Sequence, residues 1–299
     1  MPTAKIAIIG GSGLYKMEGM ADVEELGTRT PFGQPSDTMI LGNVEGTKVV
    51  FLPRHGKGHR IGPSDLPAKA NIYALKSLGV ERIISVSAVG SLKEEIQPSH
   101  LVIPNQLIDR TRGRDSSFFT GGIVGHVAFA EPFCPILSQA IFEAAIKAGA
   151  QVHKGGTYLA MEGPQFSTKA ESQLYRNWGA DVIGMTALPE AKLAREAEIC
   201  YATLALVTDY DCWHPDYESV TTEMIIANLE KGVGTARAIL KLTIPTIPQE
   251  RACPCASALR DAIATAPRYI PRKIRADLDL LVGRYLRERQ TPTGLDREQ

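Results

Sequence analysis

The chain has 299 residues, 44% of them hydrophobic and 22% charged, which is the composition of an ordinary globular protein with room for a sizeable core. Lysine plus arginine and aspartate plus glutamate both total 33, so the net charge is zero and attraction to nucleic acid or to an anionic membrane is not expected. There is neither a signal-peptide pattern at the start nor an apolar run of the roughly 20 residues that span a membrane, so we expect a cytoplasmic protein.

Strand-like and helix-like segments alternate along the first 248 residues. The first strand is expected at 5–9, and a helical stretch opens at 63–65 and ends at Gly79. Further strands are expected at 49–53, 82–86, 101–104, 157–161, 181–185 and 201–207, and further helices at 135–148, 169–178 and 189–197. A long amphipathic helix is expected at 221–242, with an inward face of Met224, Ile225, Leu229, Val233, Ala236 and Leu240. This alternation predicts an α/β fold with a mixed, mostly parallel central sheet flanked by helices on both faces.

The character of the chain changes after residue 248. Residues 249–299 carry ten lysines or arginines and seven aspartates or glutamates, with only scattered apolar residues. An amphipathic helix is expected at 274–286, with Leu278, Leu281, Val282 and Leu286 docking on the body or on a neighbouring subunit. Residues 291–299 are expected to fray. We therefore divide the chain into a main domain, 1–248, and a C-terminal helical appendage, 249–299.

The five cysteines are too sparse for a disulfide scaffold in a chain of this length. They lack paired C-x-x-C units, so we expect no metal site. Cys253 and Cys255 flank a proline and could form a strained local disulfide or a redox pair, but we interpret them as two free thiols in a surface loop.

The turn Gly10-Gly11-Ser12-Gly13 follows the first strand and suits an oxyanion. Glycines let backbone N–H groups approach a phosphate closely, and Ser12 adds a hydroxyl donor. A dinucleotide-binding G-x-G-x-x-G counted from Gly11 would need glycine at position 16, where the chain has lysine, and no Walker motif follows. Taken alone, the segment is interpreted as a tight turn.

Three more expected strands end in groups that suit a phosphate. Arg54 and His55 supply a guanidinium fork and an imidazole donor after the strand at 49–53. The pairs Ser87-Ala88 and Met185-Thr186 place a hydroxyl at two further strand ends. Taken singly, Arg54 is a surface charge and His55 a loop histidine. Four strand ends with anion donors together favour an anion site at one edge of the sheet.

Asp209 and Asp211 follow the apolar run at 201–207. If that run is a buried strand, alternation places both carboxylates on one face at its carboxyl end, where small molecules bind in open α/β sheets. A turn with two solvated or capping aspartates is an equal alternative from this segment alone.

Aromatic and imidazole groups complete the set of candidates. Phe166 and Ser167 follow the strand at 157–161 and offer a flat stacking face and a hydroxyl, although a core position is the simpler interpretation of Phe166. His59 and His126 are candidates for lining a pocket. No metal-binding spacing surrounds them.

The assembled motifs are a phosphate cradle, a stacking ring and a pair of carboxylates that could face the edge of a base. With them the chain resembles the trimeric purine nucleoside phosphorylase superfamily and, within it, the methylthioadenosine phosphorylases. The resemblance spans about residues 4–248 and rests on blocks in order: Gly10-Gly11-Ser12-Gly13-Leu14, Thr30-Pro31-Phe32-Gly33-Gln34-Pro35-Ser36-Asp37, Arg54-His55-Gly56, Gly90-Ser91-Leu92, Ala130-Glu131-Pro132-Phe133-Cys134, Met161-Glu162-Gly163-Pro164 and Thr208-Asp209-Tyr210-Asp211-Cys212-Trp213.

The resemblance implies a role for each matching position. Phosphate contacts are implied for Ser12, Arg54, His55, Ser87, Ala88 and Thr186. Ribose would lie against Met185 and Phe166, and the purine against Ser167, Asp209 and Asp211. The 5′ group would be surrounded, partly from a neighbouring subunit, by His59, His126, Val220, Thr222 and Ile225. Family members often have threonine at the positions of Ser12 and Ser87, which keeps the hydroxyl, and an aliphatic residue at Thr222.

The resemblance also implies phosphorolysis of 5′-methylthioadenosine by a homotrimer, with inorganic phosphate as co-substrate and no metal or organic cofactor. In that reaction phosphate attacks C1′ of the ribose, and Asp209, sharing a proton with Asp211, protonates or hydrogen-bonds N7 of the leaving purine. Carboxylate oxygens would accept from the 6-amino group of adenine, whereas relatives selective for 6-oxopurines carry an asparagine near this position.

Three other functions are consistent with parts of the sequence. A purine nucleoside or methylthioinosine phosphorylase would share the fold and mechanism. A nucleoside-binding protein without turnover would bind irrespective of phosphate. A nucleotide-dependent dehydrogenase is suggested only by the glycine turn, which lacks the third glycine.

Overall fold

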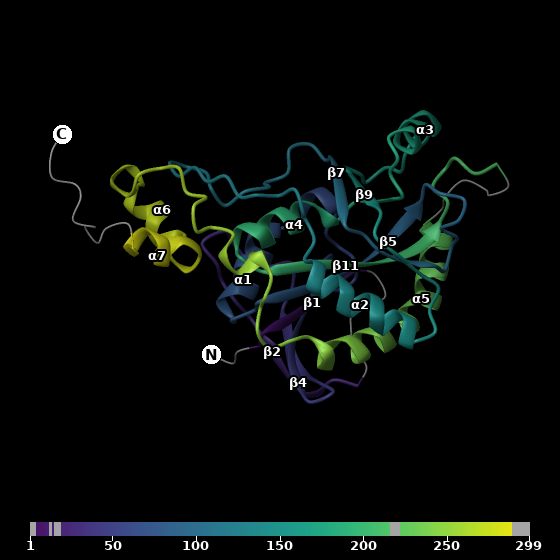
Figure 1. The fold of residues 1–299 in the computed structure, drawn as a ribbon, viewed down its shortest axis with the longest axis horizontal. Coiled ribbons are helices and arrows are strands. Elements are labelled where there is room, and N and C mark those ends of the chain that lie inside the picture. The colour runs from purple at the N-terminus through teal and green to yellow at the C-terminus, as the bar shows by residue number, and fades with distance from the viewer. Residues whose placement is uncertain (1–3, 12–13, 15–18, 216–221, 289–299) are drawn as a thin grey trace.

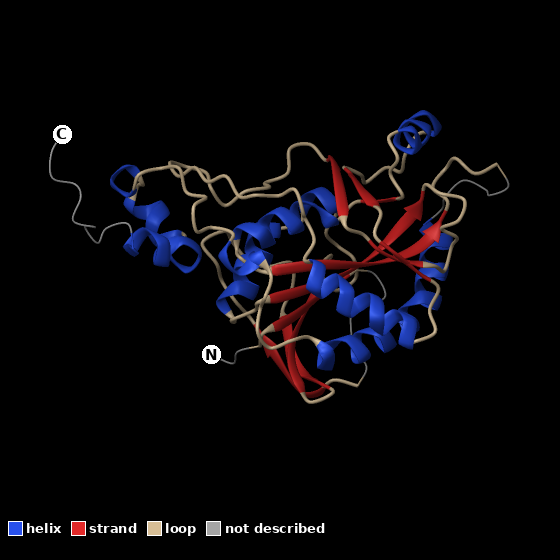
Figure 2. Cartoon of the chain, viewed as in Figure 1, coloured by secondary structure: helices blue, strands red, loops and turns tan. Residues whose placement is uncertain are grey.

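A computed structural model describes residues 4–11, 14, 19–215 and 222–288 of the chain, and for residues 222–227, 230, 231 and 288 it describes the backbone alone. The described residues form a central sheet with helices packed on both of its faces (Figures 1 and 2). The predicted α/β fold with a mixed sheet is therefore confirmed.

The sheet has eleven strands in the described part of the chain. Its main path runs β2-β3-β4-β1-β5-β10-β9-β7, and β11 pairs with β5 and β6 while β8 pairs with β6. The strands β4, β1, β5 and β11 are mutually parallel, whereas β10 runs antiparallel to β5. The strand bounds are β1 Ile6–Gly10, β2 Ala21–Leu26, β3 Met39–Val44, β4 Thr47–Pro53, β5 Arg82–Ser91, β6 Leu101–Ile103, β7 Gln106–Arg110, β8 Val152–Lys154, β9 Thr157–Met161, β10 Val182–Gly184 and β11 Cys200–Asp209.

The helices separate onto the two faces because each central strand is apolar on both sides. Along β1, Ala7 and Ile9 join one apolar cluster with α1 and α4, while Ile6 and Ile8 join another with α2 and α5. The helix bounds are α1 Ala68–Ser77, α2 Pro135–Lys147, α3 Lys169–Asn177, α4 Ala187–Glu196, α5 Thr222–Thr243, α6 Arg272–Asp277 and α7 Asp279–Glu288, with short 3₁₀ turns at Pro63–Asp65, Ile244–Thr246, Pro254–Ser257 and Pro267–Tyr269.

The strands that the sequence did not predict are β2, β3, β7 and β8. β2 and β7 end the main path of the sheet, and β2 is almost entirely exposed, so neither needs an uninterrupted apolar run. The predicted helix at 274–286 is instead two helices, α6 and α7, which meet at Leu278. Along α5, Leu229, Val233, Ala236 and Leu240 are buried as predicted, and Met224 and Ile225 lie outside the described side chains.

The appendage docks on the body of its own chain. Its predicted apolar side chains Leu278, Leu281, Val282 and Leu286 are buried in the same cluster as α1 and α4. Glu198, which follows α4, accepts from Leu259 N at 3.0 Å and from the Tyr285 hydroxyl at 2.6 Å, and it pairs with Arg284. The division of the chain at residue 248 remains a prediction.

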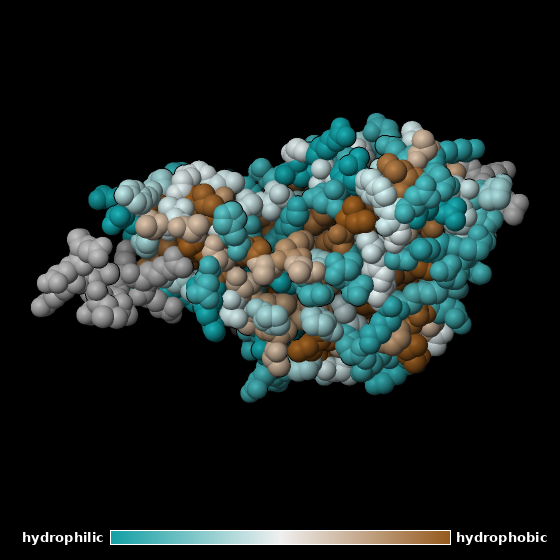
Figure 3. Space-filling view, turned by 45° about the horizontal axis from the view of Figure 1, so that its top comes forward, coloured by the Kyte–Doolittle hydropathy of each residue, from teal (hydrophilic) through white to brown (hydrophobic). Residues whose placement is uncertain are grey.

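The long loop 111–134 between β7 and α2 runs from the body to the appendage (Figure 1). It is tied there by two hydrogen bonds between backbone groups, His126 N to Ala262 O at 2.8 Å and Ala264 N to Val124 O at 2.9 Å. On the face shown in Figure 3, hydrophobic residues are interspersed with hydrophilic ones. Among the described helices, none is both long enough and apolar enough to cross a membrane.

Candidate active site at the strand ends

The strands β1 and β4 end beside the middle of the longer parallel strand β5, and this brings the first group of candidate residues into line. Gly10 is in register with Pro53 of β4 and with Val86 of β5, so the residues that follow, Gly11, Arg54 and Ser87, lie side by side. A Cβ on Gly11 would lie 3.4 Å from Arg54 Nη1, so the guanidinium faces the glycine turn. This geometry supports the predicted anion site at this edge of the sheet.

Arg54 is fixed by a buried network. Its Nε donates to Glu190 Oε1 at 2.5 Å and its Nη2 to Ser85 Oγ at 2.6 Å, while Nη1 donates to Val86 O at 3.0 Å. Burial opposes the charge, but Glu190 outweighs it, and the pKa of Arg54 lies above its usual value. The pair is 1% and 2% exposed, so Arg54 is a held cation and not the surface charge that the sequence allowed.

Two unpaired hydroxyls lie beside this cation. Ser87 Oγ and Tyr158 OH are buried and have no hydrogen-bond partner among the described residues. Burial raises the pKa of the Tyr158 hydroxyl, and Ser87, Arg54 and Thr186 act against that rise, which places the four groups together. A buried hydroxyl without a partner costs about 1–3 kcal/mol, so such groups mark a place where a ligand or water supplies the partner.

His55 is held neutral in this site. Its Nδ1 lies 2.9 Å from Ile61 O, which can only accept, so this nitrogen carries the proton. Burial, with a further contribution from Arg54, lowers the pKa of His55 to about 4. At neutral pH the remaining nitrogen, Nε2, is therefore an acceptor, and the predicted role of His55 as an imidazole donor requires correction.

The two aspartates are brought together by a turn and not by strand alternation. β11 ends at Asp209 with a register shift against β5, and Asp211 lies beyond the strand with a φ of 51°. Asp209 Oδ1 accepts from Asp211 N at 2.8 Å, and Oδ2 lies 2.6 Å from Thr208 Oγ1. A Cβ on Gly90 would lie 2.8 Å from Asp209 Oδ1, so glycine is needed beside the carboxyl group.

Both carboxyl groups bind a proton more tightly than an exposed aspartate does. Burial, opposed by Thr208 and by the Asp211 backbone, raises the pKa of Asp209 to about 6, and the Asp211 charge adds to the rise. Burial also raises the pKa of Asp211. Asp209 is 5% exposed and Asp211 6%, so the alternative of two solvated aspartates is wrong. A carboxyl group with a pKa near 6 can act as a general acid at physiological pH.

A third group of residues closes the site from the ends of β9 and β10. Ser167 O accepts from Cys212 Sγ at 3.3 Å, and the Ser167 hydroxyl acts on the pKa of Asp211. Met185 packs on Gly163, since a Cβ there would lie 2.5 Å from its sulfur. Phe166 is 42% exposed, so it is not the core aromatic that the sequence favoured.

Comparison with known proteins places the chain in a family. The family model described as the phosphorylase superfamily matches residues 5–245. The chain belongs to the phosphorylase superfamily. The predicted superfamily membership is thereby confirmed.

Relatives of this phosphorylase are known in sequence and structure. The S-methyl-5′-thioadenosine phosphorylase of Geobacter sulfurreducens is 55% identical over 282 residues, 94% of this chain and 99% of the relative. That of Chloroflexus aurantiacus is 56% identical over 286 residues, 95% and 99% of the two chains. A methylthioadenosine phosphorylase sourced from an antarctic soil metagenomic library is similar in structure, with a TM-score of 0.89, 48% identity and coverage of 94% and 99%. One from Schistosoma mansoni in complex with adenine has a TM-score of 0.79, 34% identity and coverage of 94% and 98%.

Not every predicted site residue of the phosphorylase lies at the strand ends. His59 is exposed and stacks on His55 with ring centroids 4.2 Å apart, whereas His126 lies in the loop tied to the appendage. Ser12 and Val220 lie outside the described residues, and of Thr222 and Ile225 only the backbone in α5 is described. Ala88 is half-buried in β5, opposite Leu206 of β11.

Three residues that shape the site were not predicted from the sequence. Glu190 holds Arg54, and Tyr158 supplies the second unpaired hydroxyl. Arg114 donates to Met185 O at 2.6 Å and to Glu162 Oε1 at 3.1 Å, which fixes the loops after β10 and β9 to each other. No local sequence pattern marks these three residues, because their roles depend on partners that are distant in the sequence.

Proposed function

We propose that this phosphorylase catalyses the phosphorolysis of 5′-methylthioadenosine to adenine and 5-methylthioribose 1-phosphate. The observation that carries the proposal is that a held cation and two unpaired hydroxyls lie at the same edge of the sheet as a buried carboxyl group with a raised pKa, since Asp209 pairs with Gly90, three residues after Ser87 on β5. The choice of substrate rests on the names of two relatives that are 55% and 56% identical to this chain.

Phosphate binds in this proposal at the ends of β1 and β4, beside the middle of β5. Arg54 Nη1 faces the Gly11 turn and supplies positive charge, while Ser87 Oγ and Thr186 supply hydroxyl donors, and Ser12 and Ala88 complete the cradle. His55 Nε2 accepts from the hydroxyl of HPO₄²⁻, since that nitrogen has no proton at neutral pH. The held arginine needs little reorganisation to stabilise the anion.

The nucleoside lies between the phosphate and the aspartates. Met185 and Phe166 contact the ribose, and Ser167 contacts the purine beside Asp211. The 5′ methylthio group is surrounded by His59, His126, Val220, Thr222 and Ile225, some of which come from a neighbouring subunit of a homotrimer. His126 in the loop against the appendage is consistent with a contribution to another subunit's site.

The reaction then proceeds by displacement at C1′. A phosphate oxygen forms a bond to C1′, and the electron pair of the C1′–N9 bond passes to the purine. The Asp209 carboxyl group protonates N7, and the proton that phosphate loses on becoming an ester balances the one that adenine gains. Asp211 shares the proton of Asp209, and the carboxylate oxygens accept from the 6-amino group. No step needs a metal or an organic cofactor, and the reaction would serve purine and methionine salvage in the cytoplasm.

Base release from four nucleosides tests the proposal. The purified protein is incubated with methylthioadenosine, adenosine, inosine and methylthioinosine, each with and without phosphate, and the free base is identified by chromatography. We expect phosphate-dependent adenine release that is strongest from methylthioadenosine. Hypoxanthine as the preferred product would contradict the account of base recognition, and an Asp209→Asn variant with more turnover of inosine and unchanged turnover of methylthioadenosine would contradict the role of Asp209.

A further inference from the structure

Four of the five cysteines meet at one point far from the strand ends that carry the active site. Cys134 precedes α2, Cys200 begins β11, and Cys253 and Cys255 lie at the start of the appendage. Their four Sγ atoms all lie within 4.8 Å of one another, and all four residues are buried. Cys253 and Cys255 are free thiols as expected, but the expectation that they lie in a surface loop is wrong, because the chain folds back over the body after α5.

The spacing of the sulfur atoms suits a tetrahedral metal ion. A zinc–sulfur bond of about 2.3 Å places the sulfurs of a tetrathiolate about 3.8 Å apart. The contact between Cys200 Sγ and Cys253 Sγ is 3.3 Å and no two of the four sulfurs are more than 4.8 Å apart, a range that includes that value. Two separate disulfides would not require all four sulfurs to converge.

The local backbone explains how a C-x-C sequence supplies two ligands. Cys253 is extended, with φ −98° and ψ 157°, and Pro254 then begins a 3₁₀ turn that contains Cys255. This change from extended to turned backbone brings residues i and i+2 to the same point. The absence of paired C-x-x-C units predicted no metal site, but here the other two ligands are Cys134 directly before α2 and Cys200 at the start of β11.

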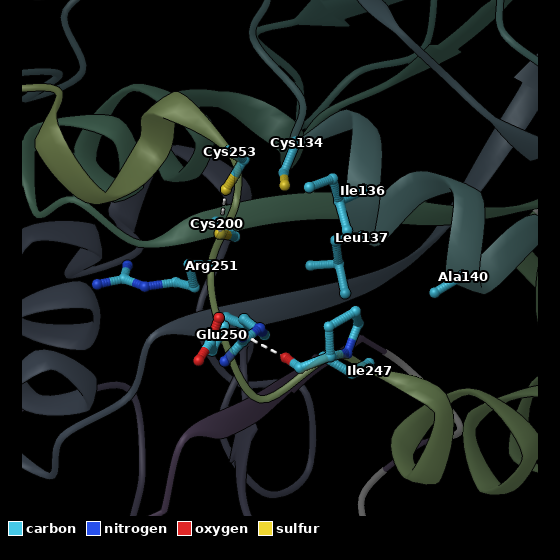
Figure 4. Close-up of a pocket in the computed structure, with 11 residues that line it drawn as sticks. Cys134, Ile136, Leu137, Ala140, Cys200, Ile247, Glu250, Arg251 and Cys253 are labelled. Atoms are coloured by element: carbon cyan, nitrogen blue, oxygen red, sulfur yellow. Dashed lines mark hydrogen bonds between the residues drawn. The ribbon is translucent and has the colours of Figure 1, made fainter.

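The segment that delivers Cys253 is held in place by two arginines. Buried Arg82 on β5 donates to Gln249 O at 3.0 Å and also to Pro248 O, and Arg251 donates to Glu198 O at 2.7 Å. Both arginines line a small pocket together with Glu250 and three of the cysteines, and Figure 4 shows the sulfurs of Cys134, Cys200 and Cys253 gathered at its end. The cluster is thus preorganised on fixed backbone, and the pocket offers a metal ion a path to it.

We propose that Cys134, Cys200, Cys253 and Cys255 bind one Zn²⁺ ion in a structural site. Four thiols release four protons to solvent as four zinc–sulfur bonds form, and no oxidant or reductant is needed. Four protein ligands leave no open position, so the ion would cross-link and not catalyse. It would join the start of α2, the start of β11 and the appendage, which in turn holds the loop with His126.

Metal analysis of the purified full-length protein tests this inference independently of its enzymatic activity. The protein is produced in zinc-supplemented medium, dialysed, and analysed for zinc and iron. We expect close to one zinc ion per chain. The Cys253→Ser and Cys255→Ser variants should lose at least ten-fold in retained zinc, whereas Cys212→Ser, which alters the fifth cysteine, should keep it. Replacement by Co²⁺ should give the strong visible bands of tetrahedral tetrathiolate cobalt.

The wild-type protein alone can overturn the inference, so it does not depend on the variants folding. Zinc-free protein with five titratable thiols after denaturation would refute the site. A mass spectrum of unreduced protein that shows disulfides among these four cysteines would refute it as well. Iron in place of zinc would overturn the choice of metal, and zinc retained equally by all three variants would place the ion elsewhere.

Discussion

Replacing Asp209 with asparagine should stabilise the folded protein at pH 8. Asp209 is buried, and burial raises the pKa of its carboxyl group from the ordinary 3.8 to about 6. The folded state therefore binds this proton more tightly than the unfolded state does, and stability falls as pH rises from about 4 through about 6. Asparagine carries no charge and does not incur this loss.

The size of the effect follows from the two pKa values. The gap between 3.8 and about 6, at about 1.4 kcal/mol for each pH unit, corresponds to about 3 kcal/mol of unfolding free energy at pH 8. Asparagine also suits the local hydrogen bonds. Its carbonyl can accept from Asp211 N, and its amide can donate to Thr208 Oγ1, whose own hydrogen is then free for Val89 O at 3.2 Å.

Denaturant unfolding of both proteins across pH 4 to 8, without phosphate and at one protein concentration, measures this difference. The stability of Asp209→Asn minus that of the wild type should rise from near zero at pH 4 to about 3 kcal/mol at pH 8. Asp261→Asn alters an exposed aspartate of the appendage and is the matched control, with no such rise expected. A difference that stays constant with pH, or a variant less stable than the wild type at pH 8, would refute the description of Asp209 as a buried carboxyl group inclined to hold its proton.

Three further substitutions test the phosphate end of the site. Ser87→Ala removes a hydroxyl that has no hydrogen-bond partner among the described residues. Measured without phosphate, the Tm of this variant should stay within about 2 °C of the wild type, whereas the KM for phosphate should rise about ten-fold or more. An unchanged KM would exclude Ser87 from phosphate binding. Glu190→Gln leaves the Arg54 charge unbalanced in a buried site and should cost about 3–5 kcal/mol in urea unfolding, so a neutral result would contradict the network. Gly184→Ala places a Cβ 2.0 Å from Tyr158 OH and should lower the free energy of unfolding by about 1–3 kcal/mol. A second substitution, Tyr158→Phe, removes that hydroxyl and should restore part of the lost stability. No restoration would show that the strain lies elsewhere.

The sequence predicted the central strands because they are buried on both faces and read as continuous apolar runs. β9 matches its prediction at both ends, and β11 extends the prediction at 201–207 by one residue before and two after. The edge strands β2 and β7 were missed because a strand with one partner in the sheet can keep polar side chains. β5 continues past the predicted end at Val86 to Ser91, and this extension pairs with β10 on one side and, at Gly90, with Asp209 on the other.

The candidate site was predictable where a residue follows an apolar run directly, as with Arg54 after β4 and Ser87 after the run at 82–86, although β5 itself continues to Ser91. It was not predictable where a role depends on a distant partner. Glu190 holds Arg54 from 136 residues away, and the pairing determines that the arginine is buried. The orientation of Asp211 depends on a left-handed backbone conformation after β11. The prediction assumed an extended strand there, so it did not include this turn. The cysteine cluster was missed for the same reason, since its members are distant in the sequence.

Phosphorus NMR of the complete reaction tests directly whether inorganic phosphate attacks the nucleoside. Purified protein is incubated with methylthioadenosine and inorganic phosphate, and the phosphorus spectrum is followed while adenine is quantified by chromatography. We expect a new sugar 1-phosphate resonance that grows in equal amount with free adenine as inorganic phosphate disappears. Adenine release with the phosphate signal unchanged would show hydrolysis instead of phosphorolysis and would contradict the assignment of Arg54, Ser87 and Thr186 to the attacking phosphate.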